Sequence, residues 1–260
     1  MLPDYAELHA LSHFSFQRGA SSPEEMVARA LALGYRALAI TDDCSMAGVV
    51  RAHLAARHTD LKLLIGTELR VQAPGLACGG FTLVMLARSR RGHGQLCELI
   101  TAARASEKRG HWRYRLRWDA APLADAPLDG VQALLLPWRE LPDQPHGSAE
   151  ADIEAAARWL RGRWGDQAWL GVALHRRLDD ALWLARLHAV SAATGVPLVA
   201  AGGALMHVRR RKPVLDVMTA IRLHRPVAEC GFALAANGEA HLRSRLGLAA
   251  LYPPELLEAT

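Results

Sequence analysis

The chain alternates short apolar runs with amphipathic stretches of helical length, and this alternation constrains the fold more than any other feature of the sequence. Runs such as Ala37–Thr41 and Val196–Ala201 are continuous in Val, Leu, Ile and Ala, which is typical of strands buried on both faces. The pattern therefore predicts an α/β fold in which helices cover both faces of a parallel sheet.

Turn and cap residues mark the boundaries of these elements. A helix opens at Ser21 or Ser22, ahead of Pro23 and two glutamates, and Gly34 ends it. The predicted strands are Tyr5–Leu11, Ala37–Thr41, Leu61–Gly66 with Glu68–Val71, Phe81–Ala87, Val131–Leu136, Ala168–Leu174 and Val196–Ala201. The predicted helices run from Pro23 to Leu33, Ser45 to His58, Gly92 to Arg109, Ala149 to Arg163, Asp179 to Thr194 and Pro213 to Leu223, with loops at Leu116–Asp129 and Pro137–Gly147.

Seven predicted strands in one continuous alternation favour a barrel over an open sheet. Because no internal repeat and no linker interrupt the chain, we predict a single domain over residues 1–260, a distorted (β/α)7 barrel. In such barrels the functional side chains gather at the carboxyl ends of the strands, so the residues that follow each strand carry the functional argument.

Composition excludes several classes of protein. The 260 residues are 51% hydrophobic and 22% charged, which is too apolar for a disordered chain. The four cysteines form no CxxC pair, which argues against a disulfide scaffold or zinc ribbon and fits a reducing, cytoplasmic location. With no apolar stretch of spanning length we expect no membrane partner. The net charge of +5 suits either a nucleic-acid partner or an ordinary arginine-rich surface.

Histidine and carboxylate side chains follow successive predicted strands. His9, Asp42, Asp43 and Glu68 are the ligand types that a hydrolytic metal site needs, because imidazole and carboxylate oxygens bind a divalent ion that acidifies water. The alternative interpretation is structural: Asp42 is also a plausible turn cap, and Glu68 a plausible partner for an arginine. The spacing of these residues leaves both interpretations open.

Three blocks of sequence carry a resemblance to a known family. They are the opening block Tyr5–His53, the segment Ile65–Leu69 (IGTEL), and the region from Val196 through the LYPPELL tail. Together they resemble the N-terminal polymerase-and-histidinol-phosphatase (PHP) domain of C-family bacterial DNA polymerases, and within that family the error-prone ImuC type of damage-induced mutagenesis. The resemblance implies a PHP barrel joined in the parent protein to a palm domain, which this chain does not contain.

The resemblance also implies a set of metal ligands, and most of them are replaced here. His9 and Glu68 are retained, and Asp43 stands where the family has a histidine. Arg18 stands where the family has an aspartate. The remaining family ligand positions correspond to Leu11, Thr82, the region of Leu136 and Pro137, Gly203 and Leu205. Several dications repel one another unless many anionic ligands surround them, so we expect no catalytic metal cluster and no cofactor.

At most, His9, Asp43 and Glu68 hold one weakly bound divalent ion. We alternatively expect His9 and Glu68 to share a charged hydrogen bond that involves Arg18. The resemblance thus implies a catalytically inactive PHP domain that supports a translesion polymerase, with the rest of the polymerase chain, mutasome proteins and DNA as partners. Two other hypotheses are a metal-dependent phosphoesterase or 3′–5′ exonuclease, and a DNA- or mutasome-binding module.

Two basic segments are candidate nucleic-acid contacts. The run Arg209, Arg210, Arg211 and Lys212 lies in a loop before a helix, where its cations are placed to meet phosphates. The stretch Arg88–Arg117 is basic, and Trp112, Tyr114 and Trp118 interleave near its end. This composition suits single-strand binding, and it also suits a solvated helix and a loop with inward-packed tryptophans.

Cys44 follows Asp43 directly. A nucleophilic role for its thiol requires a histidine base, for which His9 is the candidate. We expect instead a buried structural thiol.

Overall fold

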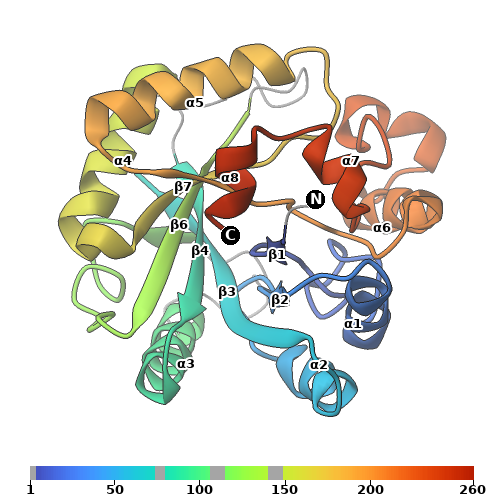
Figure 1. The fold of residues 1–260 in the computed structure, drawn as a ribbon, viewed down its shortest axis with the longest axis horizontal. Helices are drawn as coiled ribbons and strands as arrows, with labels where there is room; N and C mark the ends of the chain where they lie inside the picture. Colours follow the sequence, from blue (N-terminus) through green and yellow to red (C-terminus); the bar gives the residue numbers. More distant parts are fainter. Residues whose placement is uncertain (1–3, 74–79, 106–114, 140–148) are drawn as a thin grey trace.

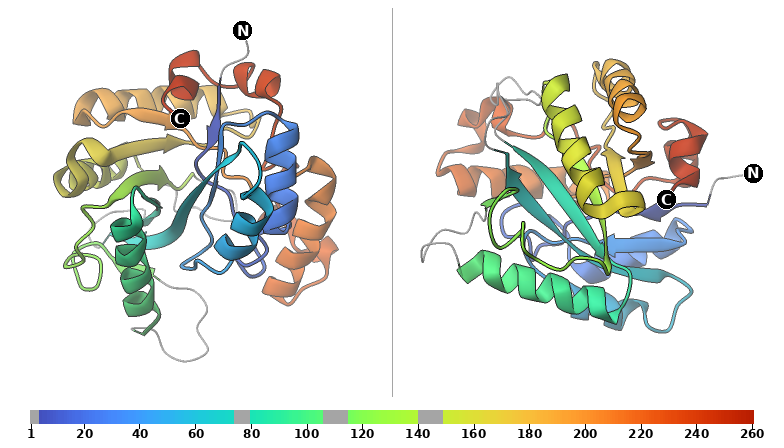
Figure 2. Two further views of the ribbon diagram at one scale, coloured as in Figure 1. Left: turned by 60° about the horizontal axis from the view of Figure 1, so that its bottom comes forward. Right: turned by 90° about the vertical axis from the view of Figure 1, so that its left-hand side faces the viewer.

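A computed structural model gives the structure of residues 4–73, 80–105, 115–139 and 149–260. These residues form an eight-stranded sheet that curls on itself, with the long helices around its outside (Figure 1). The same arrangement is seen from two further directions in Figure 2, where α3 lies along one side of the sheet. The α/β fold class is therefore confirmed.

The elements follow one another in near-regular alternation. The strands are β1 (Ala6–Glu7), β2 (Ala37–Ile40), β3 (Lys62–Gln72), β4 (Gly80–Ala87), β5 (Arg115–Arg117), β6 (Val131–Pro137), β7 (Ala168–Val172) and β8 (Leu198–Ala200). The α-helices are α1 (Pro23–Ala32), α2 (Val49–Ala56), α3 (Arg90–Ala105), α4 (Glu150–Trp164), α5 (Asp180–Thr194), α6 (Lys212–Leu223), α7 (Arg245–Ala249) and α8 (Pro254–Glu258). Four 3-10 turns complete the order: η1 (Gly165–Gln167), η2 (Arg209–Arg211), η3 (Val227–Glu229) and η4 (Gly231–Ala233).

The prediction of a wholly parallel sheet is wrong at β4. The strand order is β1-β2-β3-β4-β6-β7-β8, and β4 runs antiparallel to both of its neighbours, with β5 pairing on β3. The physical reason is the short connection between Gln72 and Gly80, since a parallel crossover needs about a dozen residues or more. The apolar run at residues 81–87 identifies a buried strand but carries no information on its direction.

The two edges of the sheet meet at the carboxyl ends of β1 and β8. Ala10 and Ala204 form a parallel bridge, in which Leu11 N donates to Ala204 O at 2.9 Å and Ala204 N donates to His9 O at 3.0 Å. Seven strands therefore follow one another around a curled sheet, as the predicted distorted barrel requires. The residues just beyond β1 and β8 are brought side by side.

The sheet packs apolar residues on both faces because its strands alternate. Leu38, Ile40, Leu83 and Met85 are buried under helices such as α1 and α3. The opposite, concave face carries a second cluster built mainly from the neighbouring strand positions. Its buried members are Ala6, Leu8, Ala37, Ala39, Val84, Leu86, Leu134, Leu136, Val199 and Ala201. The centre of the curled sheet is therefore filled core, and polar chemistry is left to the strand ends.

Helix boundaries follow the predicted caps closely in one case and less so in others. Ser22 caps α1 with a reciprocal capping box: Glu25 N donates to its hydroxyl at 3.2 Å, and Ser22 N donates to the Glu25 carboxylate at 2.8 Å. By contrast, α2 begins at Val49 rather than Ser45, whose hydroxyl instead accepts from Ala47 N in a preceding turn.

Other predicted boundaries shift as well. The regular part of β1 is much shorter than predicted, and β3 continues unbroken through Gly66. The predicted loop at 116–129 contributes its first residues to β5, and Pro137 closes β6. The predicted end of the third helix at Arg109, and most of the loop at 137–147, lie outside the described residues.

Candidate functional site

Three of the four predicted site residues converge around one arginine, at the carboxyl ends of β1 and β2 and beside the interior of the longer strand β3. His9 Nε2 lies 2.7 Å from Glu68 Oε2, and Arg18 Nη1 donates to Asp43 Oδ2 at 2.8 Å and to Glu68 Oε1. We call His9, Arg18, Asp43 and Glu68 the carboxyl-end cluster. The expected charged contact between His9, Glu68 and Arg18 is present, and Arg18 lies between the two carboxylates.

The parallel strands bring these residues together from distant parts of the chain. His9 follows β1, Asp43 follows β2, and Glu68 lies within β3, where Glu68 N donates to Thr41 O at 3.2 Å. Arg18 comes from the loop that leads from β1 to α1, and its side chain turns back over the strand ends. Sequence separation hides this contact, since Arg18 and Glu68 are 50 positions apart.

Asp42 lies next to the cluster but serves a different purpose. Its carboxylate accepts hydrogen bonds from Ser12 N at 2.8 Å, from the Ser12 hydroxyl at 2.8 Å and from the Ser15 hydroxyl at 2.7 Å. Burial raises the pKa of the Asp42 carboxyl, and these hydrogen bonds oppose that increase. Asp42 therefore acts as the turn cap that one interpretation of the sequence anticipated, holding the loop after β1.

Arg18 and His9 stabilise the charged form of Glu68 in the cluster. Burial alone would raise the pKa of the Glu68 carboxyl, but the Arg18 charge and the His9 hydrogen bond lower it to about 2. Burial also opposes the charge on Arg18, yet Glu68 and Asp43 hold its pKa above the ordinary value. For Asp43 burial is the largest effect and raises its pKa, against the attraction of Arg18. Glu68 and Arg18 thus form a buried ion pair.

The donor set does not fit the metal cluster that the family resemblance implies. A guanidinium occupies the space between the carboxylates, and a cation there repels a dication that would use the same oxygens. At another lost ligand position, the Thr82 hydroxyl accepts from Trp138 Nε1 at 3.0 Å. Within the part of the chain that the structure describes, no group of three or more His, Cys, Asp and Glu side chains is arranged to hold a metal ion.

Two further residues at these strand ends were missed at the level of sequence. His175 lies three residues beyond the end of β7, and its Nε2 lies 2.8 Å from Gly202 O. Burial lowers the pKa of its imidazole to about 4. A Cβ on Gly203 would lie 3.6 Å from both His9 Nδ1 and His175 Cε1, so the two imidazoles flank this glycine. His9 Nδ1 is buried without a hydrogen-bond partner among the described residues. The strand-end rule already identified His9 and applies equally to His175.

Glu7 is the second residue that sequence reasoning missed. Its carboxylate accepts from Tyr5 Oη at 3.0 Å, from His9 N at 3.1 Å and from Gly202 N at 2.8 Å. Burial raises the pKa of this carboxyl in spite of the three hydrogen bonds. Glu7 therefore ties β1 to the segment after β8 and holds the two edges of the curled sheet together. A glutamate within a short buried strand carries no sequence signal for this role.

The predicted basic contact is largely engaged within the protein. Arg209 pairs with Glu239, Arg211 Nη2 lies 3.0 Å from the Glu25 carboxylate, and Lys212 Nζ lies 2.6 Å from Asp216. Arg210 is exposed and is in no ion pair with another described residue. Of the four cations in the run, Arg210 is therefore the one without an ion pair to a described residue.

The tryptophan and cysteine candidates are packed within the protein where the structure describes them. Trp118 packs against Trp159, with ring centroids 5.5 Å apart, and both contact Phe81. Trp112 and Tyr114 lie outside the described residues. Burial raises the pKa of the Cys44 thiol to about 11, which keeps it protonated and favours the structural interpretation.

Comparison with known proteins assigns the class. Two solved proteins share the curled α/β fold of this chain. One, from Bifidobacterium adolescentis, is described as a metal-dependent phosphoesterase, and the match covers 77% of this chain and 88% of that one with a TM-score of 0.53 and 15% identity. The other is an amidohydrolase from Chromobacterium violaceum, with 76% and 86% coverage, a TM-score of 0.51 and 17% identity. These likenesses show the fold alone.

Residues 7–152 match the PHP domain, and the chain belongs to this family. Error-prone DNA polymerases from Dechloromonas aromatica and Pseudomonas syringae are 47% and 48% identical to it over 100% and 99% of its length. The chain spans only 24% and 23% of those relatives' own length. Among the described helices, none is both long enough and apolar enough to cross a membrane.

Proposed function

We propose that this chain is the PHP portion of a cytoplasmic error-prone DNA polymerase of the ImuC type, and that it carries out no metal-dependent hydrolysis of its own. The observation that carries the proposal is the position of Arg18. It pairs with Asp43 and Glu68 at the place where the family resemblance implies a metal-binding aspartate. The fold is kept, and at this one position a positive charge replaces the negative charge that the resemblance implies.

The energetics of the cluster support this proposal. A metal ion that bound Asp43 and Glu68 would have to displace Arg18 from both carboxylates, leaving a guanidinium that is only 16% exposed without its partners. Breaking a buried ion pair costs about 3–5 kcal/mol. The free energy of metal binding is therefore less favourable by that amount, because the coordination bonds must first offset the loss of the ion pair. The role that remains is structural, with the polymerase portion, mutasome proteins and DNA as the proposed partners.

Elemental analysis tests the proposal directly. The chain is incubated with zinc and with manganese, desalted, and its metal content measured by mass spectrometry. We expect well under one equivalent of either metal per chain. Retention of two or three equivalents, lost in His9→Ala and Glu68→Ala, would overturn the proposal and support the alternative phosphoesterase or 3′–5′ exonuclease, for which hydrolysis of a phosphodiester is then assayed.

A single substitution provides the matched gain-of-binding experiment. Arg18→Asp removes the blocking cation and returns the carboxylate that the family resemblance implies. His9, Asp43 and Glu68 then face a third carboxylate, a donor set of the type that divalent ions accept. We expect this variant to retain about one equivalent of metal where the parent chain retains almost none. Arg18→Asn, which removes the cation without adding a carboxylate, is the control.

The DNA-binding hypothesis is tested separately. Because Arg210 is the cation of its run without an ion pair to a described residue, Arg210→Ala combined with Arg211→Ala should remove any salt-dependent affinity of the chain for single-stranded DNA. An affinity that is unchanged in this variant, or absent at low salt in the parent chain, would exclude this run as the contact.

A further inference from the structure

One side of α6 carries an apolar stripe that nothing in the described structure covers. Val214, Val217 and Ile221 are 40%, 49% and 55% exposed, and their spacing of three and four residues places them on one face of the helix. The opposite face of the same helix is buried, with Leu215 and Ala220 against the body of the protein. The helix is therefore apolar on two sides, whereas a helix at a free surface is apolar on one.

Two more exposed apolar side chains lie on the turns that follow α6. The turn η3 packs against α6, and its Val227 is 39% exposed. The next turn, η4, carries Phe232 at 73% exposure. Exposed apolar residues that gather in one region of a protein surface mark a site of interaction with another protein surface.

The charges at the two ends of the stripe are of one sign. Arg210 lies just before α6 and Arg225 just after it, where Arg225 N donates to Ala220 O at 3.1 Å. Both arginines are exposed, and neither is in an ion pair with another described residue. Asp216, the acidic residue of the helix, is held by Lys212. The exposed carboxylate nearby is that of Glu229 on η3.

We propose that this stripe is a docking surface for one amphipathic helix that carries acidic residues near both of its ends, and that the helix belongs to the polymerase portion of the parent polypeptide. Residues at i, i+3 and i+7 form a seam one helix wide, which fits a single helix lying along α6. Acidic residues at its ends meet Arg210 and Arg225. The proposal rests on the proposed function only for the source of the helix.

A second copy of this chain is a poorer occupant. Pairing α6 with itself in antiparallel fashion brings Arg210 of one copy to Arg225 of the other, and pairing it in parallel brings like residues together. Either arrangement places guanidinium groups opposite each other, which opposes association. The polymerase portion is favoured because the relatives matched by the whole chain are about four times its length, which leaves ample polypeptide to cover the stripe.

Hydrogen exchange tests the docking surface. The matched segment of the Dechloromonas aromatica polymerase is replaced by this chain, and amide exchange in α6 is compared between the chimera and the isolated chain. We expect exchange in α6 to slow at least about tenfold in the chimera, since docked amides open less often. Equal exchange rates in both proteins would overturn the proposal, as would dimerisation of the isolated chain that Ile221→Asp abolishes.

Matched variants separate apolar docking from charge. Val217→Ser with Ile221→Ser should remove the added protection in the chimera, and Arg210→Glu with Arg225→Glu should remove most of it. The control is Val50→Ser with Leu54→Ser, which alters an exposed apolar pair on α2 and should leave the protection of α6 unchanged. If the control has the same effect as the α6 variants, the stripe has no specific role.

The result is independent of the metal experiment. If the isolated chain retains several metal equivalents while α6 is protected in the chimera, the proposed loss of hydrolysis is overturned and the docking surface is still supported. The isolated α6 double variant must keep the thermal unfolding midpoint of the parent chain to within about 3 °C, which shows that the exposed substitutions do not act through the fold.

Discussion

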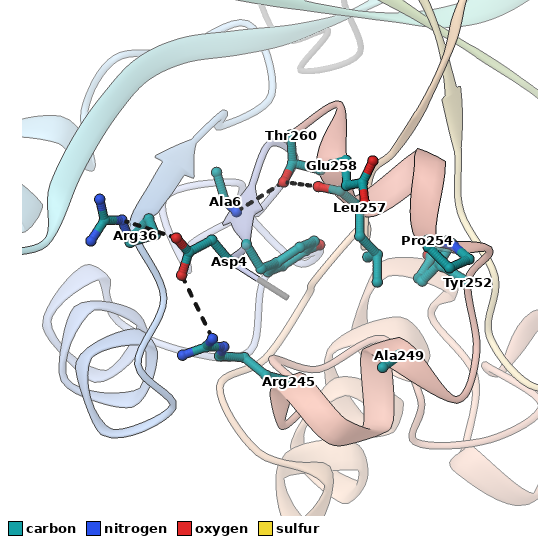
Figure 3. Close-up of a pocket in the computed structure, with 11 residues that line it drawn as sticks. Asp4, Ala6, Arg36, Arg245, Ala249, Tyr252, Pro254, Leu257, Glu258 and Thr260 are labelled. Atoms are coloured by element: carbon teal, nitrogen blue, oxygen red, sulfur yellow. Dashed lines mark hydrogen bonds and ion pairs between the residues drawn. The ribbon is translucent and has the colours of Figure 1, made fainter. Parts of the chain in front are cut away.

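Charged residues at the two ends of the curled sheet are arranged in opposite ways. In the carboxyl-end cluster the side chains of Arg18 and Glu68 are 16% and 1% exposed, and they lie in direct contact. At the other end, a groove with a cavity of about 790 Å³ opens beside the starts of β1 and β2 (Figure 3). There Asp4 and Arg36 are 70% and 72% exposed and 3.8 Å apart, and Arg245 lies 3.6 Å from Asp4.

The difference shows which end of the sheet departs from the usual arrangement of a βα barrel. In βα barrels the carboxyl end is the functional end, and open space is expected there. Here ion pairs and hydrogen bonds occupy that end, while the open cavity lies at the amino end, which in barrels contributes to stability. The contrast predicts that charges at the carboxyl end matter strongly to folding and that charges at the amino-end groove matter little.

The largest expected effect comes from removing Arg18. Arg18→Leu leaves Asp43 and Glu68 buried beside each other without a cation, which should lower the free energy of unfolding by about 3–5 kcal/mol at neutral pH. Urea unfolding followed by circular dichroism measures the loss. A loss below about 1 kcal/mol, comparable with that of an exposed ion pair, would remove the contrast between the two ends.

The second prediction concerns pH. Because the folded pKa of Glu68 is lowered to about 2 from an ordinary value of 4.5, its ionisation stabilises the fold above pH 4.5, and this stabilisation is lost as the pH falls toward 2. The stability difference between the parent chain and Glu68→Gln should therefore shrink by about 3 kcal/mol over that interval.

Glu7 should behave in the opposite sense. Burial raises the pKa of its carboxyl, so its proton is bound more tightly in the folded chain, and ionisation above pH 4.5 costs stability. The free energy of unfolding of the parent chain should therefore rise relative to that of Glu7→Gln as the pH falls. Unfolding titrations of both variants against the parent chain give the two slopes; slopes of the same sign would show that the assigned causes are wrong.

A third, smaller effect is expected where the sheet edges meet. A Cβ on Gly202 would lie 2.1 Å from Glu7 Oε2, so Gly202→Ala must displace the carboxylate that joins β1 to the segment after β8. Overpacking of this kind costs about 1–3 kcal/mol. Gly94→Ala on α3 is the matched control: nothing lies within 4 Å of its added Cβ, and it should stabilise the helix by up to about 1 kcal/mol. Thermal unfolding of the two variants should shift in opposite directions.

Local signals in the sequence predicted part of this structure well. Ser22 and Gly34 mark the two ends of α1 through backbone groups within a few residues, and the structure places both where the cap rules predict. The convergence of His9, Asp43 and Glu68 also followed from the sequence, since strand order and the carboxyl-end rule are enough to bring them together.

What the sequence could not provide depends on partners far apart in the chain. The direction of β4 is set by a short connection and by pairing with β3 and β6. An apolar run in the sequence does not indicate whether a strand is parallel or antiparallel to its neighbours. From the sequence alone, a carboxylate in a buried strand looks unfavourable. The structure accounts for Glu7 by three hydrogen-bond donors, Tyr5 Oη and the amides of His9 and Gly202. The involvement of Arg18 with Glu68 was expected from the sequence, but its simultaneous contact with Asp43 was not.

The smallest expected effect lies in the amino-end groove. Asp4→Asn removes the carboxylate that faces both Arg36 and Arg245, yet these contacts of 3.8 and 3.6 Å are exposed and longer than hydrogen bonds. Exposed pairs of this kind contribute about 0–1 kcal/mol and are screened by salt. We expect urea unfolding to change by less than about 0.5 kcal/mol at physiological salt. A loss as large as that of Arg18→Leu would mean that the groove is organised by its charges, and the two ends of the sheet would no longer differ in kind.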